Sequence, residues 1–169
     1  MGVTVILYLG GRFLYFKHGL SPGEKVPQFN TSLADGSAFS LDQLQGNYVL
    51  LDFWGSWCGP CIGDRAILSD LYREYHTASF TKSNGFDIVS IAIEKSEGHW
   101  REALRKFDPL WPYQILDESS NLRFFDGRIA KQFGVKRLPA KFLLDPEGRV
   151  IEVNPSWEKV RELLNARRI

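Results

Sequence analysis

The chain has 169 residues, 44% of them hydrophobic and 14% aromatic, which is enough for one domain with a sizeable core. Its 21 basic and 20 acidic residues give a net charge of +1, and neither sign forms a long run. This balance does not favour binding to nucleic acid or to an acidic partner. We therefore expect a single-domain, monomeric protein without a nucleic-acid surface.

The first residues are apolar, but the apolar stretch is short. Residues 3–9 and 13–16 are apolar, and Gly10, Gly11 and Arg12 interrupt them. The stretch 3–16 is shorter than the roughly 20 apolar residues that span a membrane. One interpretation is an N-terminal anchor, which would lengthen if the reading frame began upstream. The other is a hairpin, because a Gly-Gly pair between two apolar runs can form a tight turn.

We expect the domain itself to cover residues 26–169, after an N-terminal segment and linker over residues 1–25. Asp35 and Gly36 predict a hairpin turn. Two apolar runs separated by a helical pattern predict parallel strands of a βαβ unit. The expected elements are hairpin strands over 29–34 and 37–41, a helical turn at 41–44, a strand over 48–54, a helix over 60–75, a loop over 76–85, a strand over 86–93, a helix over 96–107, an edge strand over 111–116 limited by Pro112, a helix ending at 131–133, strands over 140–144 and 149–153, and a helix over 157–165.

The motif that carries chemistry lies at residues 48–61, YVLLDFWGSWCGPC. A short apolar run, typical of a strand buried on both faces, ends there at two cysteines with CxxC spacing. Pro60 fits the first turn of a helix, so Cys58 should precede the helix and Cys61 should lie one turn later, placed to close a disulfide. The free N–H groups at a helix start favour an anion, so we expect the Cys58 thiol to face solvent, to have a lowered pKa and to act as the nucleophile.

The sequence WCGPC after a buried Phe-Trp strand resembles the thioredoxin superfamily, and the whole chain resembles its TlpA/ResA-type thiol-disulfide oxidoreductases. The resemblance implies an α/β, thioredoxin-like three-layer fold with a central mixed sheet, helices on both faces and an added N-terminal β-hairpin. It also implies that Cys58 and Cys61 form a redox-active disulfide and that no other cofactor is needed. In this superfamily a cis proline packs against the CxxC pair, and Pro139 matches its position.

The resemblance also indicates a surface that receives the partner protein. Its expected residues are Trp57, Gly59, Pro60, Leu138 and Pro139. Leu138, Ala140 and Lys141 are bulkier or more basic than the threonine-rich neighbours typical of the family. This departure leaves the substrate preference open, although it does not affect the chemistry. Trp54 is expected to pack in the core.

Two carboxylates accompany the cysteines. Asp52, six residues before Cys58, matches the buried aspartate of thioredoxins, for which the resemblance implies a proton carrier for the second cysteine. Burial on a strand raises a carboxyl pKa toward the range useful for a general base or acid. Asp64, three residues after Cys61, matches a glutamate with which many TlpA/ResA-type proteins tune their thiols. The alternative for Asp64 is an ordinary acid near the start of a helix.

Other functions fit the motif less well. A peroxiredoxin needs a threonine three residues before its reactive cysteine and a proline further upstream, where this chain has Gly55 and Leu51. A copper-delivery protein would have CxxxC spacing, and a zinc site would need further ligands, whereas the three histidines are scattered. We therefore expect no metal. A redox-inactive partner-binding module could lose the cysteines or the proline, but all are present.

The expected partners are protein thiols and disulfides, together with an upstream electron donor. The resemblance implies an N-terminal anchor, so it favours the anchor for residues 3–16. It also favours an extracytoplasmic location, in the periplasm or cell envelope, while a cytoplasmic location stays open. Proteins of this family in such a location take part in cell redox homeostasis and often reduce selected substrates, such as the thiols of apocytochrome c during cytochrome c maturation.

Overall fold

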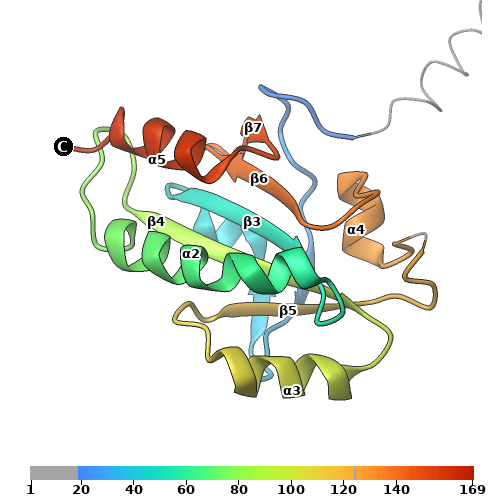
Figure 1. Cartoon of the computed structure of the whole chain (residues 1–169). Helices are drawn as coiled ribbons and strands as arrows, with labels where there is room; N and C mark the ends of the chain where they lie inside the picture. Colours follow the sequence, from blue (N-terminus) through green and yellow to red (C-terminus); the bar gives the residue numbers. More distant parts are fainter. Residues whose placement is uncertain (1–18, 124) are drawn as a thin grey trace, which may run out of the picture.

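The computed structural model describes residues 19–123 and 125–169 (Figure 1). In chain order the elements are β1 (Asn30–Ser32), β2 (Ala38–Ser40), the 3-10 helix η1 (Leu41–Leu44), β3 (Tyr48–Trp54), α2 (Gly59–Tyr75), β4 (Phe86–Glu94), α3 (Glu97–Phe107), β5 (Tyr113–Glu118), α4 (Arg128–Phe133), β6 (Ala140–Leu144), β7 (Val150–Val153) and α5 (Trp157–Asn165). The anchor or hairpin expected over residues 3–16 lies outside the described residues. No helix within the described part of the chain is long and apolar enough to cross a membrane.

Five strands form one mixed sheet in the order β5-β4-β3-β6-β7. The central strand β3 is parallel to β4 and antiparallel to β6. Every residue of β3 and β4 is buried, which explains why apolar and polar residues do not alternate along either strand. The register places Ala140 of β6 opposite Phe53 of β3. The start of β6 therefore lies beside the end of β3.

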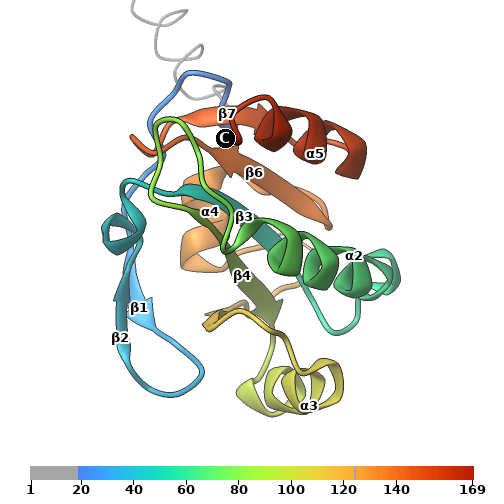
Figure 2. The ribbon, with the colours of Figure 1, turned by 90° about the vertical axis from the view of Figure 1, so that its left-hand side faces the viewer.

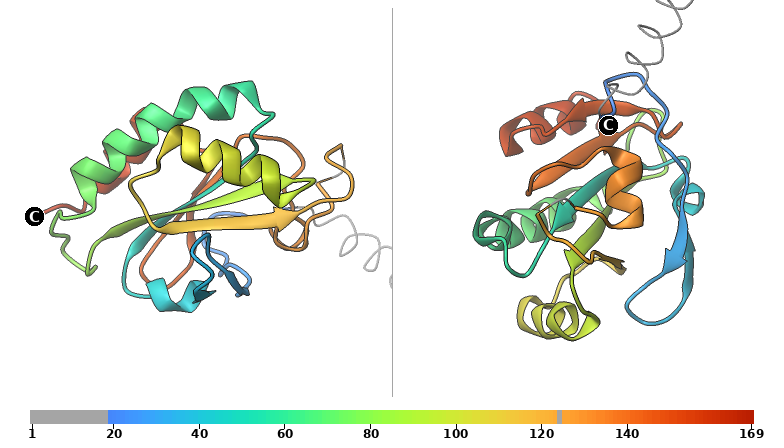
Figure 3. Two further views of the ribbon diagram at one scale, coloured as in Figure 1. Left: turned by 90° about the horizontal axis from the view of Figure 1, so that it is seen from below. Right: turned by 90° about the vertical axis from the view of Figure 1, so that its right-hand side faces the viewer.

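Alternate residues of β3 point to opposite faces of the sheet, and each face is covered. Leu50 packs in a cluster that includes Leu68 of α2 and Val160 of α5. Leu51 packs in a second cluster, which includes Phe133 of α4 and Phe39 of the hairpin. Figures 2 and 3 show α2, α3 and α5 on one side of the sheet and α4 with the hairpin on the other. The expected three-layer fold with helices on both faces is confirmed.

The hairpin of β1 and β2 forms a separate two-stranded sheet. It turns at Gly36, whose φ of +86° is easily adopted only by glycine. Two arginines connect it to the helices. Nη1 of Arg101 in α3 donates to the carbonyl of Ala34 at 2.7 Å, and Nη2 of Arg128 in α4 donates to the carbonyl of Asn30 at 2.8 Å. The added hairpin is thus fixed against the domain.

Some boundaries differ from the sequence prediction because tertiary contacts decide them. The first hairpin strand ends at Ser32, since Leu33 bridges to Ile115 of β5 instead. The edge strand β5 begins at Tyr113, directly after Pro112, which has no N–H to give to the sheet. Trp111, expected in that strand, is buried before it.

Candidate active site

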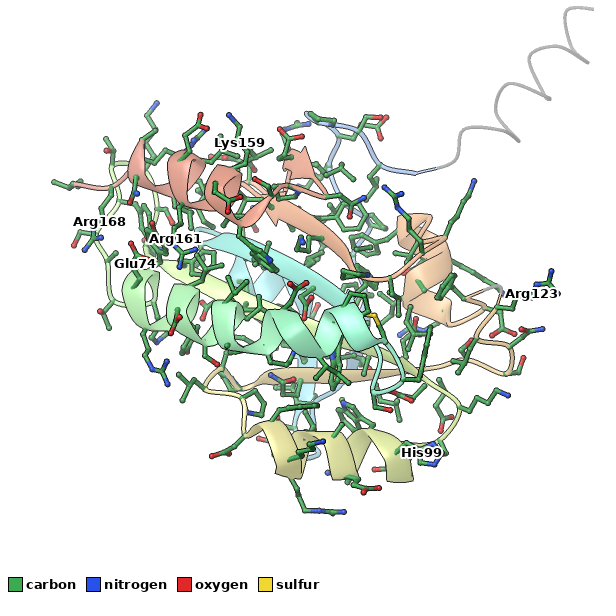
Figure 4. All side chains as sticks on the ribbon, viewed as in Figure 1. Glu74, His99, Arg123, Lys159, Arg161 and Arg168 are labelled. Atoms are coloured by element: carbon green, nitrogen blue, oxygen red, sulfur yellow. A yellow bond between two sulfur atoms is a disulfide. The ribbon has the colours of Figure 1, made fainter. Side chains whose placement is uncertain are left out.

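The two cysteines lie at the start of α2, just beyond the end of β3. Cys58 is the N-cap residue, the helix begins at Gly59, and Pro60 occupies the first turn, as the sequence predicts. Cys58 and Cys61 form a disulfide with an S–S distance of 2.06 Å, seen as the yellow bond at the start of α2 in Figure 4. The backbone N–H of Cys61 donates to Sγ of Cys58 at 3.3 Å. The helix N-terminus therefore faces the Cys58 sulfur, where it stabilises negative charge.

Neither sulfur is freely exposed in the disulfide form. Cys58 is 6% exposed and Cys61 is 1% exposed. Both belong to a small apolar cluster with Trp54 of β3 and Trp100 of α3. The sequence predicts that Cys58 faces solvent, and in the disulfide form this prediction is wrong, because Cys58 is buried. Cys58 is the more accessible of the two sulfurs, but apolar neighbours bury most of it. Trp54 packs in the core, as expected.

The second wall of the site is the loop that enters β6. The Leu138–Pro139 peptide bond is cis, which confirms the sequence prediction. Because Ala140 pairs with Phe53, Pro139 lies at the edge of the sheet where β3 ends. The half-buried side chain of Leu138 packs against the cluster that contains both cysteines. The cis-proline loop and the CxxC motif therefore meet at one edge of the sheet.

Asp52 lies on β3 and is fully buried, as the sequence predicts. Its Oδ2 forms an ion pair with the guanidinium of Arg65 and accepts a hydrogen bond from the Ser90 hydroxyl at 3.1 Å. Nε of Arg65 donates to the backbone carbonyl of Cys61 at 3.2 Å. Arg65 and Ser90 are not among the residues that the sequence predicts for the site. The available signal was the spacing of four residues between Cys61 and Arg65, which places them on one helical face.

Asp64 contacts a different element. Its Oδ1 accepts a hydrogen bond from Nε1 of Trp157, the first residue of α5, at 3.0 Å. Nζ of Lys141 in β6 lies 4.0 Å from the centroid of the same indole ring. Asp64 is therefore directed toward α5, whereas the neighbouring Arg65 is directed toward Asp52. The role of Asp64 in tuning the thiols stays a prediction.

The surface beside the cysteines is aromatic. Trp57 is 44% exposed, and its Nε1 donates to the carbonyl of Ile93 at 2.9 Å. Its ring stacks on Phe125, with centroids 6.3 Å apart and ring planes at 24°. Gly59 and Pro60 are also exposed. Phe125 is not predicted from the sequence, because it lies in an irregular loop between β5 and α4 that has no periodic pattern.

The turn between β3 and α2 leaves no room for a side chain at Gly55. A Cβ there would lie 2.7 Å from Nε1 of Trp57 and 3.2 Å from the carbonyl oxygen of Ile93. The next residue, Ser56, donates its N–H to the buried carboxylate of Glu94. A peroxiredoxin would place a threonine at position 55, so this close packing counts against the peroxidase alternative.

A CxxC pair can also be half of a metal site. Across residues 19–123 and 125–169, no three His, Cys, Asp or Glu side chains gather as ligands for a metal ion. His99 lies on α3 (Figure 4), and the Nδ1 atom of His76 lies 3.5 Å from Oδ1 of Asp87. Neither histidine belongs to the cluster that holds the disulfide.

Comparison with known proteins identifies the family. The sequence pattern of the Redoxin family matches residues 21–166, which is most of the chain. The chain belongs to the Redoxin family. Within the Redoxin family it resembles the thiol-disulfide oxidoreductase ResA of Bacillus cereus (strain ZK / E33L), with 29% identity over 150 residues, 89% of this chain and 78% of the relative. ResA of Bacillus subtilis (strain 168) is 28% identical over 137 residues, 81% of this chain and 69% of the relative.

Solved structures show which fold the chain shares with known proteins. The thioredoxin domain of a thiol-disulfide oxidoreductase from Bacteroides vulgatus superposes with a TM-score of 0.72 at 22% identity, covering 88% of this chain and 98% of that one. A thiol-disulfide oxidoreductase from Bacteroides fragilis NCTC 9343 superposes with a TM-score of 0.71 at 27% identity, covering 85% of this chain and 98% of that one. The fold is thioredoxin-like. Together with the disulfide between Cys58 and Cys61, the relatives identify a ResA-like thiol-disulfide oxidoreductase.

Proposed function

We propose that this thiol-disulfide oxidoreductase reduces disulfides in partner proteins and is recharged by an upstream electron donor. The observation that carries the proposal is the dipeptide between the cysteines, Gly59-Pro60, which holds no histidine to stabilise the Cys58 thiolate. A moderately stabilised thiolate makes the dithiol form less favoured. The protein then gives up its electrons readily, and its own disulfide needs a strong donor to reopen.

The first step is attack by the Cys58 thiolate on one sulfur of the partner disulfide. The position of Cys58 as the N-cap of α2 supports this order, because the helix N-terminus stabilises a sulfur anion. A bond forms between Cys58 and the partner sulfur. The second partner sulfur leaves with the bonding electron pair and takes up a proton. Trp57, Leu138 and Pro139 would receive the partner chain around the reacting sulfurs.

The second step releases the partner. Asp52 accepts the proton of the Cys61 thiol, and the Cys61 sulfur attacks Cys58. The bond from Cys58 to the partner breaks, and the partner sulfur leaves with the electron pair. The two steps oxidise one enzyme dithiol to a disulfide and reduce one partner disulfide to a dithiol. Asp64, one residue before Arg65, would adjust how easily the thiols ionise.

We further propose that the domain works outside the cytoplasm, in the periplasm or cell envelope, held by an N-terminal anchor. The apolar stretch 3–16 and the TlpA/ResA resemblance support this proposal. Protein disulfides form in that compartment, so a reductase has substrates there. Apocytochrome c is a candidate substrate, because its C-x-x-C-H motif must be a dithiol before haem attaches.

A phosphatase fusion tests the proposed location. Alkaline phosphatase matures only outside the cytoplasm, so alkaline phosphatase fused to the C-terminus of this protein should be active. An inactive phosphatase fusion beside a fluorescent cytoplasmic reporter fusion would contradict the location.

Trapping of the mixed disulfide tests the function itself. In Cys61→Ser the second step cannot occur, so the partner should remain bound to Cys58 in a disulfide that dithiothreitol releases. The matched control is Cys58→Ser, which should trap nothing. Reduction of an oxidised C-x-x-C-H peptide and of insulin by the wild-type dithiol then compares the candidate substrates. Equal trapping by the two variants, or no reduction of either substrate, would contradict the proposal.

A further inference from the structure

Arg65 is a cation buried directly behind the redox pair. The residue is only 8% exposed, and it lies on α2 one turn after Cys61. Its guanidinium makes an ion pair with Asp52, donates from Nε to the Cys61 carbonyl at 3.2 Å, and lies with Cζ 4.5 Å from the centroid of the Trp54 ring. Nη1 reaches the Ser90 hydroxyl at 3.5 Å. One side chain therefore connects the resolving cysteine to the buried acid.

Stability alone does not explain this pair. Removing two charges from water is expensive, and apolar side chains of similar volume often replace a buried ion pair without loss of stability. Breaking such a pair is costly, because the remaining charge then has no partner. A buried acid without a cation would therefore favour its neutral form. The structure keeps the cation next to the acid, and the same cation donates to the backbone carbonyl of the resolving cysteine.

The two oxygens of Asp52 are not equivalent. Oδ2 is engaged by both Arg65 and the Ser90 hydroxyl. Ser90 is itself fixed, because its Oγ also accepts a hydrogen bond from Nε1 of Trp111 at 3.1 Å. Oδ1 is buried, and no group among the described residues donates to it. The oxygen with open acceptor capacity is therefore Oδ1.

We propose that Arg65 is a positioning residue that keeps Asp52 ionised and holds Oδ2, so that Oδ1 can accept the proton of Cys61. The inference rests on the role that the proposed function gives to Asp52. In the second step the Cys61 proton passes to Oδ1, the Cys61 sulfur bonds to Cys58, and the partner sulfur leaves with the electron pair of the broken bond. Asp52 then returns its proton to solvent. Arg65 takes no proton and touches no partner atom.

The test follows the second step as a function of pH. A mixed disulfide is formed on Cys58 with a thiol-reactive peptide, and release of the peptide is measured between pH 5 and 9. Asp52→Asn should slow release at neutral pH by about 10²-fold, the low end for loss of a general base. Arg65→Gln should slow it at least tenfold at neutral pH, because the unpaired acid stays neutral. The release rate of Arg65→Gln should recover as the pH rises, so its pH profile should shift to higher pH.

Three further variants separate positioning from structural support. Arg65→Lys keeps the cation and should recover most of the wild-type rate. Asp52→Asn/Arg65→Gln should behave like Asp52→Asn, because without the acid the cation has nothing to hold ionised. Arg73→Gln, an exposed arginine of the same helix, should leave the profile unchanged. The rate at which the Cys58 thiolate forms the mixed disulfide reports whether each variant is folded.

The outcomes are distinguishable. If Arg65→Gln lowers the rate equally at all pH values, Arg65 only supports the structure and the inference fails. If Asp52→Asn has no effect, Asp52 is not the proton carrier and the inference fails, while Cys61→Ser trapping still tests the proposed function separately. If Arg65→Gln does not fold, infrared difference spectra of the wild-type protein decide. A protonated-acid band at neutral pH that Asp52→Asn removes would overturn the inference, and its absence supports an ionised Asp52.

Discussion

Nε1 of Trp157 donates a hydrogen bond of 3.0 Å to Oδ1 of Asp64, so the first residue of α5 is tied to the redox helix. A second contact joins the same two helices further along, where Nε of Arg161 lies 3.4 Å from Oε2 of Glu74 (Figure 4). The helix α5 therefore helps to hold α2, the helix that Cys58 caps and that contains Cys61. Asp64 has a structural partner in addition to its expected role near the thiols.

The hydrogen bond between Trp157 and Asp64 predicts that two substitutions lower the free energy of unfolding by different amounts. Trp157→Phe keeps an aromatic ring but removes the donor, so it should lower the free energy of unfolding by about 1 kcal/mol. Asp64→Asn keeps an acceptor and should cost less. Denaturant titration measures both, with the exposed Lys159→Gln of α5 as a control expected within about 0.5 kcal/mol of wild type. A larger loss in Asp64→Asn than in Trp157→Phe would show that the hydrogen bond is not the main effect.

A second prediction concerns the two thiols of the reduced protein. Cys58 caps α2 and is the more exposed cysteine, whereas Cys61 lies inside the helix. A limiting amount of iodoacetamide at neutral pH should therefore label Cys58 at least tenfold faster than Cys61, because the thiolate is the species that reacts. Peptide mapping by mass spectrometry measures the ratio. Equal labelling would count against Cys58 as the nucleophile.

The reduction potential is the third prediction. Gly59-Pro60 lies between the cysteines, as in thioredoxin, and no histidine is there to stabilise a thiolate. The potential should lie near about −270 mV, far from the value of about −120 mV found in a strong oxidant. Equilibration with glutathione buffers measures it. A potential above roughly −180 mV would favour oxidation or isomerisation over reduction.

The aromatic pair beside the disulfide gives the fourth prediction. Phe125 stacks on the half-exposed ring of Trp57, so the two rings offer a surface to a partner chain, and Phe125 itself packs against a different apolar cluster from the one that holds the sulfurs. Phe125→Ala should raise KM for a protein disulfide about five- to tenfold, because the partner chain loses one aromatic contact. The rate with a small disulfide such as oxidised glutathione should stay within about twofold. Equal losses with both substrates would indicate damage to the redox centre itself.

The fifth prediction uses a buried acid far from the cysteines in the sequence. Burial raises the pKa of Asp87, and the hydrogen bond from Asn47 and the nearby His76 only partly oppose this effect. Since the folded-state pKa exceeds the unfolded value, the group favours folding below the unfolded pKa, and that contribution is lost as pH rises through the folded pKa. Asp87→Asn should therefore stabilise the protein at pH 7, with a smaller difference at pH 4. Urea unfolding at both pH values measures this, and a gain confined to pH 4 would contradict it.

The sequence predicts the centre of this site well and its surroundings poorly. The limits of β3 and the start of α2 follow from a continuous apolar run and from Pro60, which are local signals. The cis peptide bond at Pro139 follows from the resemblance to the thioredoxin superfamily, since a proline at the start of an edge strand is ordinarily trans. The partners of Asp52 and Asp64 do not follow, because they depend on how α2 is rotated over the sheet and where α5 packs. Helical spacing alone could not show that Arg65 reaches β3.

The contact between Trp57 and Phe125 has a related explanation. Phe125 has a φ of +48°, which is uncommon for an aromatic residue, and no sequence pattern predicts that conformation. The carboxylate of the next residue, Asp126, accepts hydrogen bonds from the hydroxyls of Ser119 and Ser120 and holds the loop closed. Such a loop is specified by side-chain contacts rather than by periodicity.

The disulfide encloses a very small ring, because its cysteines are three positions apart in the sequence. The entropy that a cross-link removes from an unfolded chain grows with the logarithm of the ring size, so this bond restricts the unfolded chain far less than a long-range bridge would. The paired residues of β3, β4 and β6 all lie outside this ring. We therefore expect opening and closing of the ring to leave the architecture in place, so that the protein passes through many catalytic cycles without unfolding.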